Sequence, residues 1–168
     1  FPNTVYDEAK VSDEKLHPRY SFELELAKKY MNLDKPMLGI CAGMQVMATI
    51  VGAKLYRDVR KELPTTIDHL NEHPAEAPAH GIKIKAGTHL NKILGVDTLQ
   101  VNSAHKEAIK TRPERLKINA TATDGVIEGI EIPDRRFCIG IQWHPEFFAN
   151  AENPQMNIFT SLVKAANS

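Results

Sequence analysis

Three things are scarce in this chain, and each scarcity excludes a class of protein. The 168 residues include two cysteines, Cys41 and Cys138, which are too few for a disulfide scaffold and are expected to be reduced thiols in a cytoplasmic protein. No apolar run approaches the ~18 residues needed to span a bilayer. Excess charge is also absent, because 21 basic residues balance 21 acidic ones. A neutral chain offers no electrostatic footprint for nucleic acid or an anionic membrane.

The chain also has no starting methionine and no signal-peptide pattern of basic, apolar and small-residue regions. Because it begins at Phe1, we expect either that a segment was removed or that the sequence is part of a longer protein. What is present is ordinary for a globular protein, with 42% hydrophobic and 25% charged residues. The length suits one domain, which can bury roughly 70% of its extended surface.

The first half of the chain alternates between helical and strand patterns. Residues 1–18 are polar and are expected to form a loop. Apolar residues at helical spacing predict a helix from residue 21 to about residue 32. The continuous apolar run at 37–40 predicts a strand buried on both faces, and residues 42–51 predict a second helix. Helix, buried strand, tight turn and helix are typical of a parallel α/β sheet.

The second half of the chain carries strand patterns after a long irregular segment at residues 60–80. Five short alternating runs predict strands at 81–86, 98–101, 116–123, 126–132 and 137–142. Thr123-Asp124-Gly125 is expected to form a hairpin turn between two of them, and residues 152–166 are expected to form the last helix. The prediction is therefore one α/β domain over 1–168, with a parallel core and an antiparallel later portion.

A Gly-x-Cys-x-Gly motif spans residues 39–43, between the predicted buried strand and the second helix. It is the thiol analogue of the Gly-x-Ser-x-Gly nucleophile elbow. A nucleophile on such a turn sits in strained backbone, and flanking glycines remove side chains that would clash. The amides at the helix start favour the thiolate of Cys41 and can hold an oxyanion. The alternative is a buried cysteine that packs as a small apolar residue.

A cysteine nucleophile needs a base, and His144 follows a predicted strand end as Cys41 does. Ligands gather at the carboxyl ends of strands in α/β sheets. Glu146 lies two residues further along and is close enough to orient the imidazole. The alternative is that this His-Pro-Glu segment is a surface turn.

These two motifs together resemble those of the class I glutamine amidotransferases. The matching runs are GICAGMQ at 39–45 and QWHPE at 142–146. Three other segments are similar to the γ-glutamyl-γ-aminobutyrate hydrolase group of that superfamily: RYSFE at 19–23, VNSAHKEAI at 101–109 and ATDGVIEGIE at 122–131. The resemblance covers nearly the whole chain.

The resemblance implies a flavodoxin-like fold with a mostly parallel sheet flanked by helices. It implies a catalytic triad of Cys41 as nucleophile, His144 as base and acid, and Glu146 as the group that orients the histidine. A γ-glutamyl thioester would form, the amine would leave, and water would release glutamate, with no cofactor. The residues implied for substrate binding are Ala42, whose backbone amide is one oxyanion donor, Gln45, Asn102, Ser103 and His105.

The chain departs from the family pattern in two ways. The family has a Gly-Gly loop and two βα units, ~60 residues, ahead of the region that matches Phe1. We therefore expect the functional protein to be longer, because a sheet without those strands exposes a wide apolar edge. The second departure is Ala42, where the hydrolase group usually carries arginine, and Lys106-Glu107, where it often carries His-Gln.

Other residues are weighed more briefly. His69, His73 and His80 have a spacing that suggests a metal site, but prolines interrupt the segment and no cysteine or paired carboxylate completes a ligand set. No metal site is therefore expected. Cys138 lies in an apolar strand and is expected to be core.

The expected activity is that of a cytoplasmic hydrolase acting on a small γ-glutamyl substrate, without nucleic-acid or membrane partners. A homodimer is compatible with this assignment. One alternative is a glutaminase subunit that passes ammonia to a synthase on a separate chain. Another is a non-catalytic relative that has kept the fold.

Overall fold

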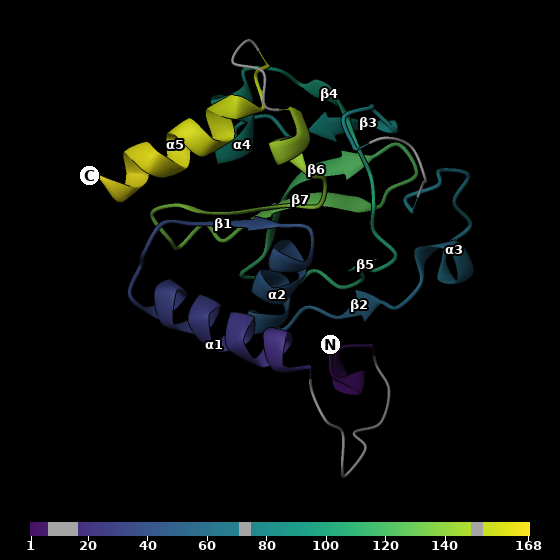
Figure 1. The fold of residues 1–168 in the computed structure, drawn as a ribbon, viewed down its shortest axis with the longest axis horizontal. Coiled ribbons are helices and arrows are strands. Elements are labelled where there is room, and N and C mark those ends of the chain that lie inside the picture. The colour runs from purple at the N-terminus through teal and green to yellow at the C-terminus, as the bar shows by residue number, and fades with distance from the viewer. Residues whose placement is uncertain (7–16, 71–74, 149–152) are drawn as a thin grey trace.

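A computed structural model describes residues 1–6, 17–70, 75–148 and 153–168 (Figure 1). The helices are η1 (Asn3–Tyr6), α1 (Pro18–Asn32), α2 (Ala42–Ile50), α3 (Val59–Glu62), α4 (His89–Leu94), η2 (Pro145–Phe148) and α5 (Met156–Ala166), of which η1 and η2 are 3₁₀ helices. The strands are β1 (Met37–Ile40), β2 (Leu55–Tyr56), β3 (His80–Ile84), β4 (Thr98–Val101), β5 (Ala108–Ile109), β6 (Lys117–Ala122), β7 (Ile127–Glu131) and β8 (Cys138–Ile141). None of the described helices has the length and apolar character needed to cross a membrane.

Six strands form one mixed sheet in the order β1-β8-β7-β6-β3-β4, and β2 pairs with β5 in a separate ribbon. β1 and β8 are parallel, with Met37 opposite Cys138 and Ile40 opposite Ile141. The other pairings of the large sheet are antiparallel. Parallel pairing within the described residues is thus confined to β1 and β8, so the sheet is less parallel than the sequence suggested.

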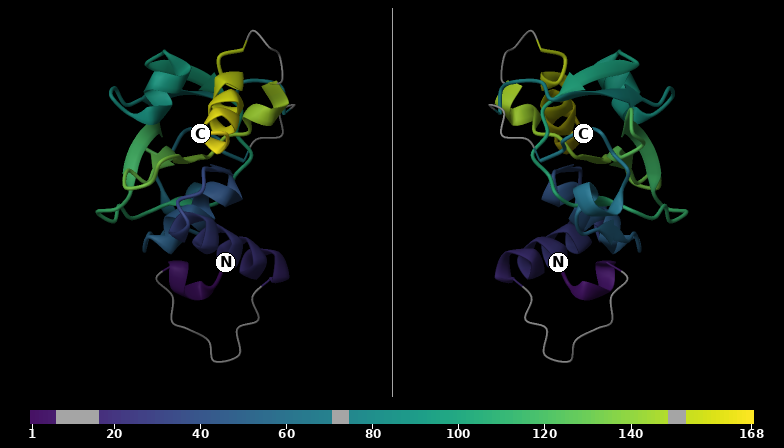
Figure 2. Two further views of the ribbon diagram at one scale, coloured as in Figure 1. Left: turned by 90° about the vertical axis from the view of Figure 1, so that its left-hand side faces the viewer. Right: turned by 90° about the vertical axis from the view of Figure 1, so that its right-hand side faces the viewer.

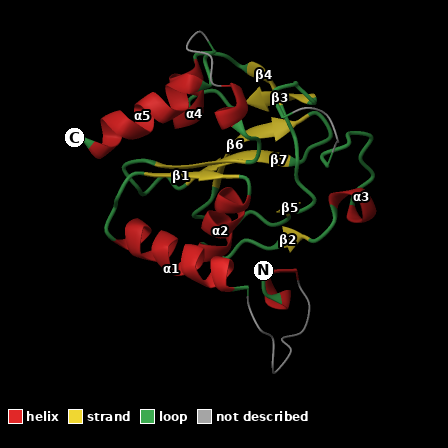
Figure 3. Cartoon of the chain, viewed as in Figure 1, coloured by secondary structure: helices red, strands yellow, loops and turns green. Residues whose placement is uncertain are grey.

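Helices cover both faces of the sheet, with α1 and α2 on one side and α4 and α5 on the other (Figures 1, 2 and 3). Side chains alternate along β8 between these two layers, as they do in any strand. Cys138 belongs to the core cluster of α2, whereas Ile139 and Ile141 belong to the cluster that includes Ile158 of α5. At Gly140 an added Cβ would lie 2.6 Å from Cγ of Met44, so α2 packs directly on the backbone of β8.

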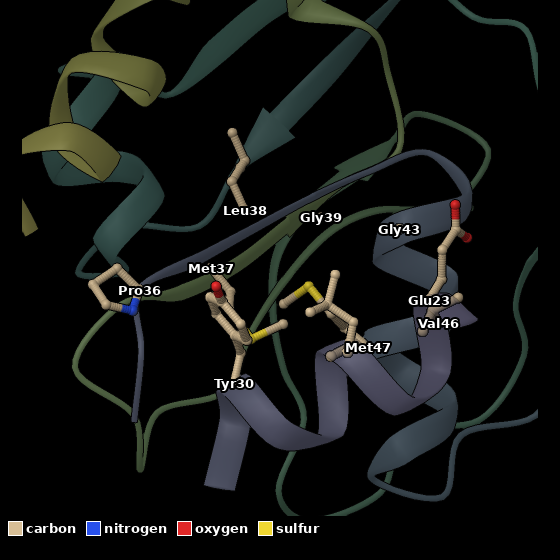
Figure 4. A pocket seen from close by; sticks show the side chains of 11 residues that line it. Glu23, Tyr30, Pro36, Met37, Leu38, Gly39, Gly43, Val46 and Met47 are labelled. Atoms are coloured by element: carbon tan, nitrogen blue, oxygen red, sulfur yellow. The ribbon is translucent and has the colours of Figure 1, made fainter. Parts of the chain in front are cut away.

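The predicted strand β1 differs from expectation in its burial. Met37, Leu38 and Ile40 are each half-buried, because β8 is the one described strand that pairs with β1. A cavity of about 420 Å³ opens along this edge between α1, β1 and α2 (Figure 4). Among its lining residues are Tyr30, which is 44% exposed, and Met47. The apolar stripe predicted for the first helix therefore faces solvent in part.

Candidate active site

Cys41 stands at the abrupt junction between β1 and α2. Its amide donates to the carbonyl of Ile141 at 2.8 Å, which continues the parallel strand pairing, while its carbonyl accepts from Gln45 at 3.2 Å, which begins the helix. One residue must therefore turn the chain from strand to helix, and Cys41 does so with φ 51° and ψ −110°. A positive φ at a non-glycine residue costs roughly 1–3 kcal/mol and is typical of functional positions.

The two glycines around Cys41 have different environments. A Cβ on Gly39 would lie 2.4 Å from Sδ of Met47 and 2.7 Å from the backbone carbon of Gly43, so α2 can approach β1 only with glycine there. A Cβ on Gly43 would meet no atom of the described residues within 4 Å. Of the two glycines predicted to relieve a clash, Gly39 does so in the described structure.

His144 follows β8 as Cys41 follows β1, and the parallel register places the ends of these strands side by side. Its pKa is raised to about 9, first by the hydrogen bond with Cys41, with burial opposing the rise and Glu146 adding to it. Oε1 of Glu146 lies 2.6 Å from Nδ1 of the ring. The structure thus brings together the three residues of the predicted triad.

Gln142 is a further residue at the thiol that sequence reasoning did not single out. Its Nε2 donates to Sγ of Cys41 at 3.5 Å, while its Oε1 accepts from Nε2 of Gln45 at 3.1 Å. Gln45 also donates to the backbone carbonyl of Glu107 at 3.0 Å and is 2% exposed. Gln45 thus orients Gln142, and its predicted role in binding substrate stays a prediction. The position of Gln142 two residues before His144 was the available signal.

The predicted residues of the Asn-Ser-x-His segment are buried and hold the framework of the site. Asn102 accepts from the amide of His144 at 2.8 Å and donates to its carbonyl at 2.9 Å. Ser103 donates to the carbonyl of His69 at 2.8 Å, and Nδ1 of His105 lies 2.9 Å from the carbonyl of Glu107. Contact of these three residues with a substrate stays a prediction.

Ala42 and Cys138 are the other two residues considered from the sequence. Ala42 is the first residue of α2, directly after the nucleophile, and is half-buried. Cys138 is buried in the core, and burial raises the pKa of its thiol to about 12.

Residues able to bind a metal gather one strand away from the triad. Ligand atoms of His69, His80 and Glu128 lie within 4.8 Å of one another. The sequence argument against a metal site was that no cysteine or paired carboxylate completes the set, and it did not consider the single carboxylate that Glu128 supplies from β7. His73, the third histidine of that argument, lies outside the described residues.

Comparison with known proteins identifies relatives of the chain. The family model described as peptidase C26 matches residues 2–146. Protein NtpR of Enterococcus hirae is 32% identical over 146 residues, which cover 85% of this chain and 60% of NtpR. The γ-glutamyl-γ-aminobutyrate hydrolase PuuD of Escherichia coli is 31% identical over 136 residues, which cover 77% of this chain and 53% of PuuD. The chain thus spans a little over half the length of these relatives.

A solved structure with a similar fold is the glutaminase domain of Trypanosoma brucei CTPS with bound acivicin. Its TM-score is 0.67 at 20% identity, over 92% of this chain and 69% of that one. This similarity confirms the predicted α/β, flavodoxin-like fold with helices on both faces of the sheet.

Proposed function

Because the chain belongs to the peptidase C26 family and is similar to a γ-glutamyl-γ-aminobutyrate hydrolase, we propose that it hydrolyses the γ-glutamyl amide bond of glutamine or a γ-glutamyl amine. The observation that best supports this proposal is the parallel pairing of β1 with β8. It sets Cys41, on a strained elbow, beside His144 with its Glu146 partner.

In the first step the Cys41 thiolate attacks the γ-carbonyl carbon of the substrate. The amide at the start of α2, from Ala42, stabilises the oxyanion, because charge develops where that donor points. The protonated His144 gives its proton to the amine as the C–N bond breaks, which leaves a γ-glutamyl thioester on Cys41. The raised pKa of His144 keeps this proton available at neutral pH.

In the second step the neutral His144 takes a proton from water, and the resulting hydroxide attacks the thioester carbon. The C–S bond breaks, glutamate leaves, and the thiolate of Cys41 again faces a protonated His144. Glu146 does not react but stabilises the imidazolium and fixes the ring orientation through its bond to Nδ1.

Graded variants of the intact protein test this mechanism by release of glutamate from γ-glutamyl amides. Cys41→Ala removes the covalent route and His144→Ala removes its base, so each should lose nearly all activity, because the two act as a unit. Glu146→Gln keeps the shape and loses the charge, and it should lose less. Exposed Lys83→Ala is the control. Full activity in His144→Ala would reject the mechanism.

We expect the protein to recognise the glutamyl half of its substrate more strongly than the amine that leaves. Ala42 offers no fixed positive charge, and an arginine there would give a carboxylate-bearing amine a contact of ~1.5–3 kcal/mol. We therefore expect kcat/KM to differ by less than ~100-fold, about 2.7 kcal/mol, between γ-glutamyl amides of carboxylated and neutral amines.

Turnover by the purified protein alone also separates a hydrolase from a glutaminase subunit, which would be sluggish without its synthase chain.

A further inference from the structure

Four buried side chains meet one strand away from the triad and take no part in it. They are His69, His80, His105 and Glu128, and Glu128 is 0% exposed. They come, in that order, from the segment between α3 and β3, from the first residue of β3, from the segment after β4, and from the second residue of β7. Burial of a carboxylate among imidazoles is costly unless a cation or a complete hydrogen-bond network compensates it.

Three ring nitrogens approach the same oxygen of Glu128. The distances to its Oε1 are 3.4 Å from Nδ1 of His69, 3.7 Å from Nε2 of His80 and 3.3 Å from Nε2 of His105. None of these approaches has the geometry of a hydrogen bond, so among the described residues these three nitrogens and both carboxylate oxygens have no hydrogen-bond partner. Two ligands of one tetrahedral zinc ion lie about 3.3 Å apart when each is ~2.0–2.1 Å from the metal. The separations from Oε1 of Glu128 lie close to that spacing, and the ligand atoms of His69, His80 and Glu128 all lie within 4.8 Å of one another.

The outward nitrogen of each ring faces an acceptor. Nε2 of His69 lies 2.9 Å from a carboxylate oxygen of Asp124, and Nδ1 of His105 lies 2.9 Å from the carbonyl of Glu107. Nδ1 of His80 lies 3.4 Å from the carbonyl of the next residue. With its hydrogen on this outward nitrogen, each neutral ring would point a lone pair at Glu128. Metal-bound histidines are oriented in this way by carboxylates and carbonyls.

We propose that His69, His80, His105 and Glu128 bind one divalent transition-metal ion, for which zinc is the best match. Imidazole nitrogen together with one carboxylate selects such a metal over Mg²⁺ and Ca²⁺, which prefer oxygen alone. The site revises the expectation from the sequence that no metal is bound. It does not depend on the proposed hydrolysis, because no ligand belongs to the triad.

The ion would act as a structural link beneath the active site. His105 is three residues from Asn102, which holds both the amide and the carbonyl of His144. The same ion would join this segment to His69, to β3 and to β7 through Glu128. Removal of the metal should therefore lower the thermal midpoint of unfolding and loosen the segment that positions His144.

The test uses the intact protein in a Cys41→Ala background, because a thiolate and His144 would otherwise offer zinc a second site. The protein is stripped with a chelator, titrated with Zn²⁺ by calorimetry, and assayed for bound metal after gel filtration. We expect about one zinc per chain, a raised thermal midpoint with Zn²⁺ and no such rise with Mg²⁺. Co²⁺ should give the visible absorption of tetrahedral coordination.

Variants locate the ion. Glu128→Gln and His80→Asn each remove a ligand and should abolish stoichiometric binding. Asp124→Asn leaves the four ligands in place and alters the partner of His69, which also accepts from Thr65 and the Val126 amide, and it should weaken zinc binding by about 10–100-fold. His89→Asn alters an exposed histidine of α4 and should bind as the parent does.

The competing explanation is that protons alone neutralise the cluster. In that case the stripped protein would bind no zinc, and ¹⁵N spectra would show protons on the inward ring nitrogens, unchanged by added metal. Either that result or undiminished zinc binding in folded Asp124→Asn and Glu128→Gln would overturn the proposal.

Discussion

At the scale of single residues, the two cysteines illustrate how the backbone decides reactivity. Cys41 occupies a strained position at the start of a helix, in contact with His144 and Gln142. Cys138 lies in the core between the sheet and α2, where burial raises the pKa of its thiol and disfavours the thiolate. The thiolate is the reactive form of cysteine, so environment alone should separate the two.

Iodoacetamide should therefore label Cys41 in the folded protein and leave Cys138 largely unmodified. Labelling should abolish γ-glutamyl hydrolysis in proportion to the modified fraction, as measured by peptide mass spectrometry alongside the assay. Denatured protein is the control and should label at both positions. Preferential labelling of Cys138 in the folded state would contradict the assignment of the nucleophile.

The raised pKa of His144 should respond to its two partners. The hydrogen bond with Cys41 is the largest cause of the rise to about 9, so Cys41→Ala should lower the midpoint of the ring titration followed by NMR. This raised pKa also makes the free energy of unfolding depend on pH. The stabilisation from His144 is complete below pH 6.5, the pKa of the residue in the unfolded chain, and is lost as the pH rises through about 9.

Glu146→Gln should lower the same midpoint by less than Cys41→Ala does, because Glu146 is the smaller cause. An unchanged midpoint in Cys41→Ala would show that thiol and imidazole do not form the contact described above.

At the scale of elements, the strand–elbow–helix unit and the hairpin were predictable, because short-range patterns determine them. Gly125 has φ 88° at the predicted hairpin turn, where glycine is favoured. β2 and β5 were not predictable, because each has only two residues and is defined by its pairing with the other, which is distant in sequence. Gln142 and Glu128 were missed as functional candidates for a related reason, because their roles arise from residues distant in sequence.

The elbow depends on Gly39 more than on Gly43. Gly39→Ala would place a Cβ 2.7 Å from the backbone of Gly43, which cannot move aside as a flexible side chain can. We expect a loss of about 1–3 kcal/mol in the free energy of unfolding, measured by urea denaturation. Gly43→Ala is the matched control and should be neutral or stabilising by up to ~1 kcal/mol, because its space is open and alanine favours helix. Equal losses in both variants would refute the packing argument.

At the scale of the whole molecule, β1 is an edge strand, and among the described residues no strand pairs with its outer side. β8 is its one described strand partner, and the cavity of Figure 4 runs beside it. The relatives NtpR and PuuD are longer than their matched regions, which cover 60% and 53% of them. We propose that in the complete protein further βα units pair with β1 and supply the second oxyanion amide.

Hydrogen exchange tests this proposal amide by amide. The amide of Met37 donates to the carbonyl of Phe137, directly before β8, and that of Cys41 donates to Ile141 at its end. N–H groups alternate in direction along a strand, so those of Leu38 and Ile40 point to the open edge. If a further strand pairs there, these two amides should exchange at least about tenfold slower in the complete protein than in residues 1–168 alone, a difference of ~1.4 kcal/mol in local opening. The Gly39 amide, which faces β8, is the internal control and should be protected in both. Equal exchange of Leu38 and Ile40 in the two proteins would mean that this edge stays open, and the second oxyanion donor would then have to come from residues already described.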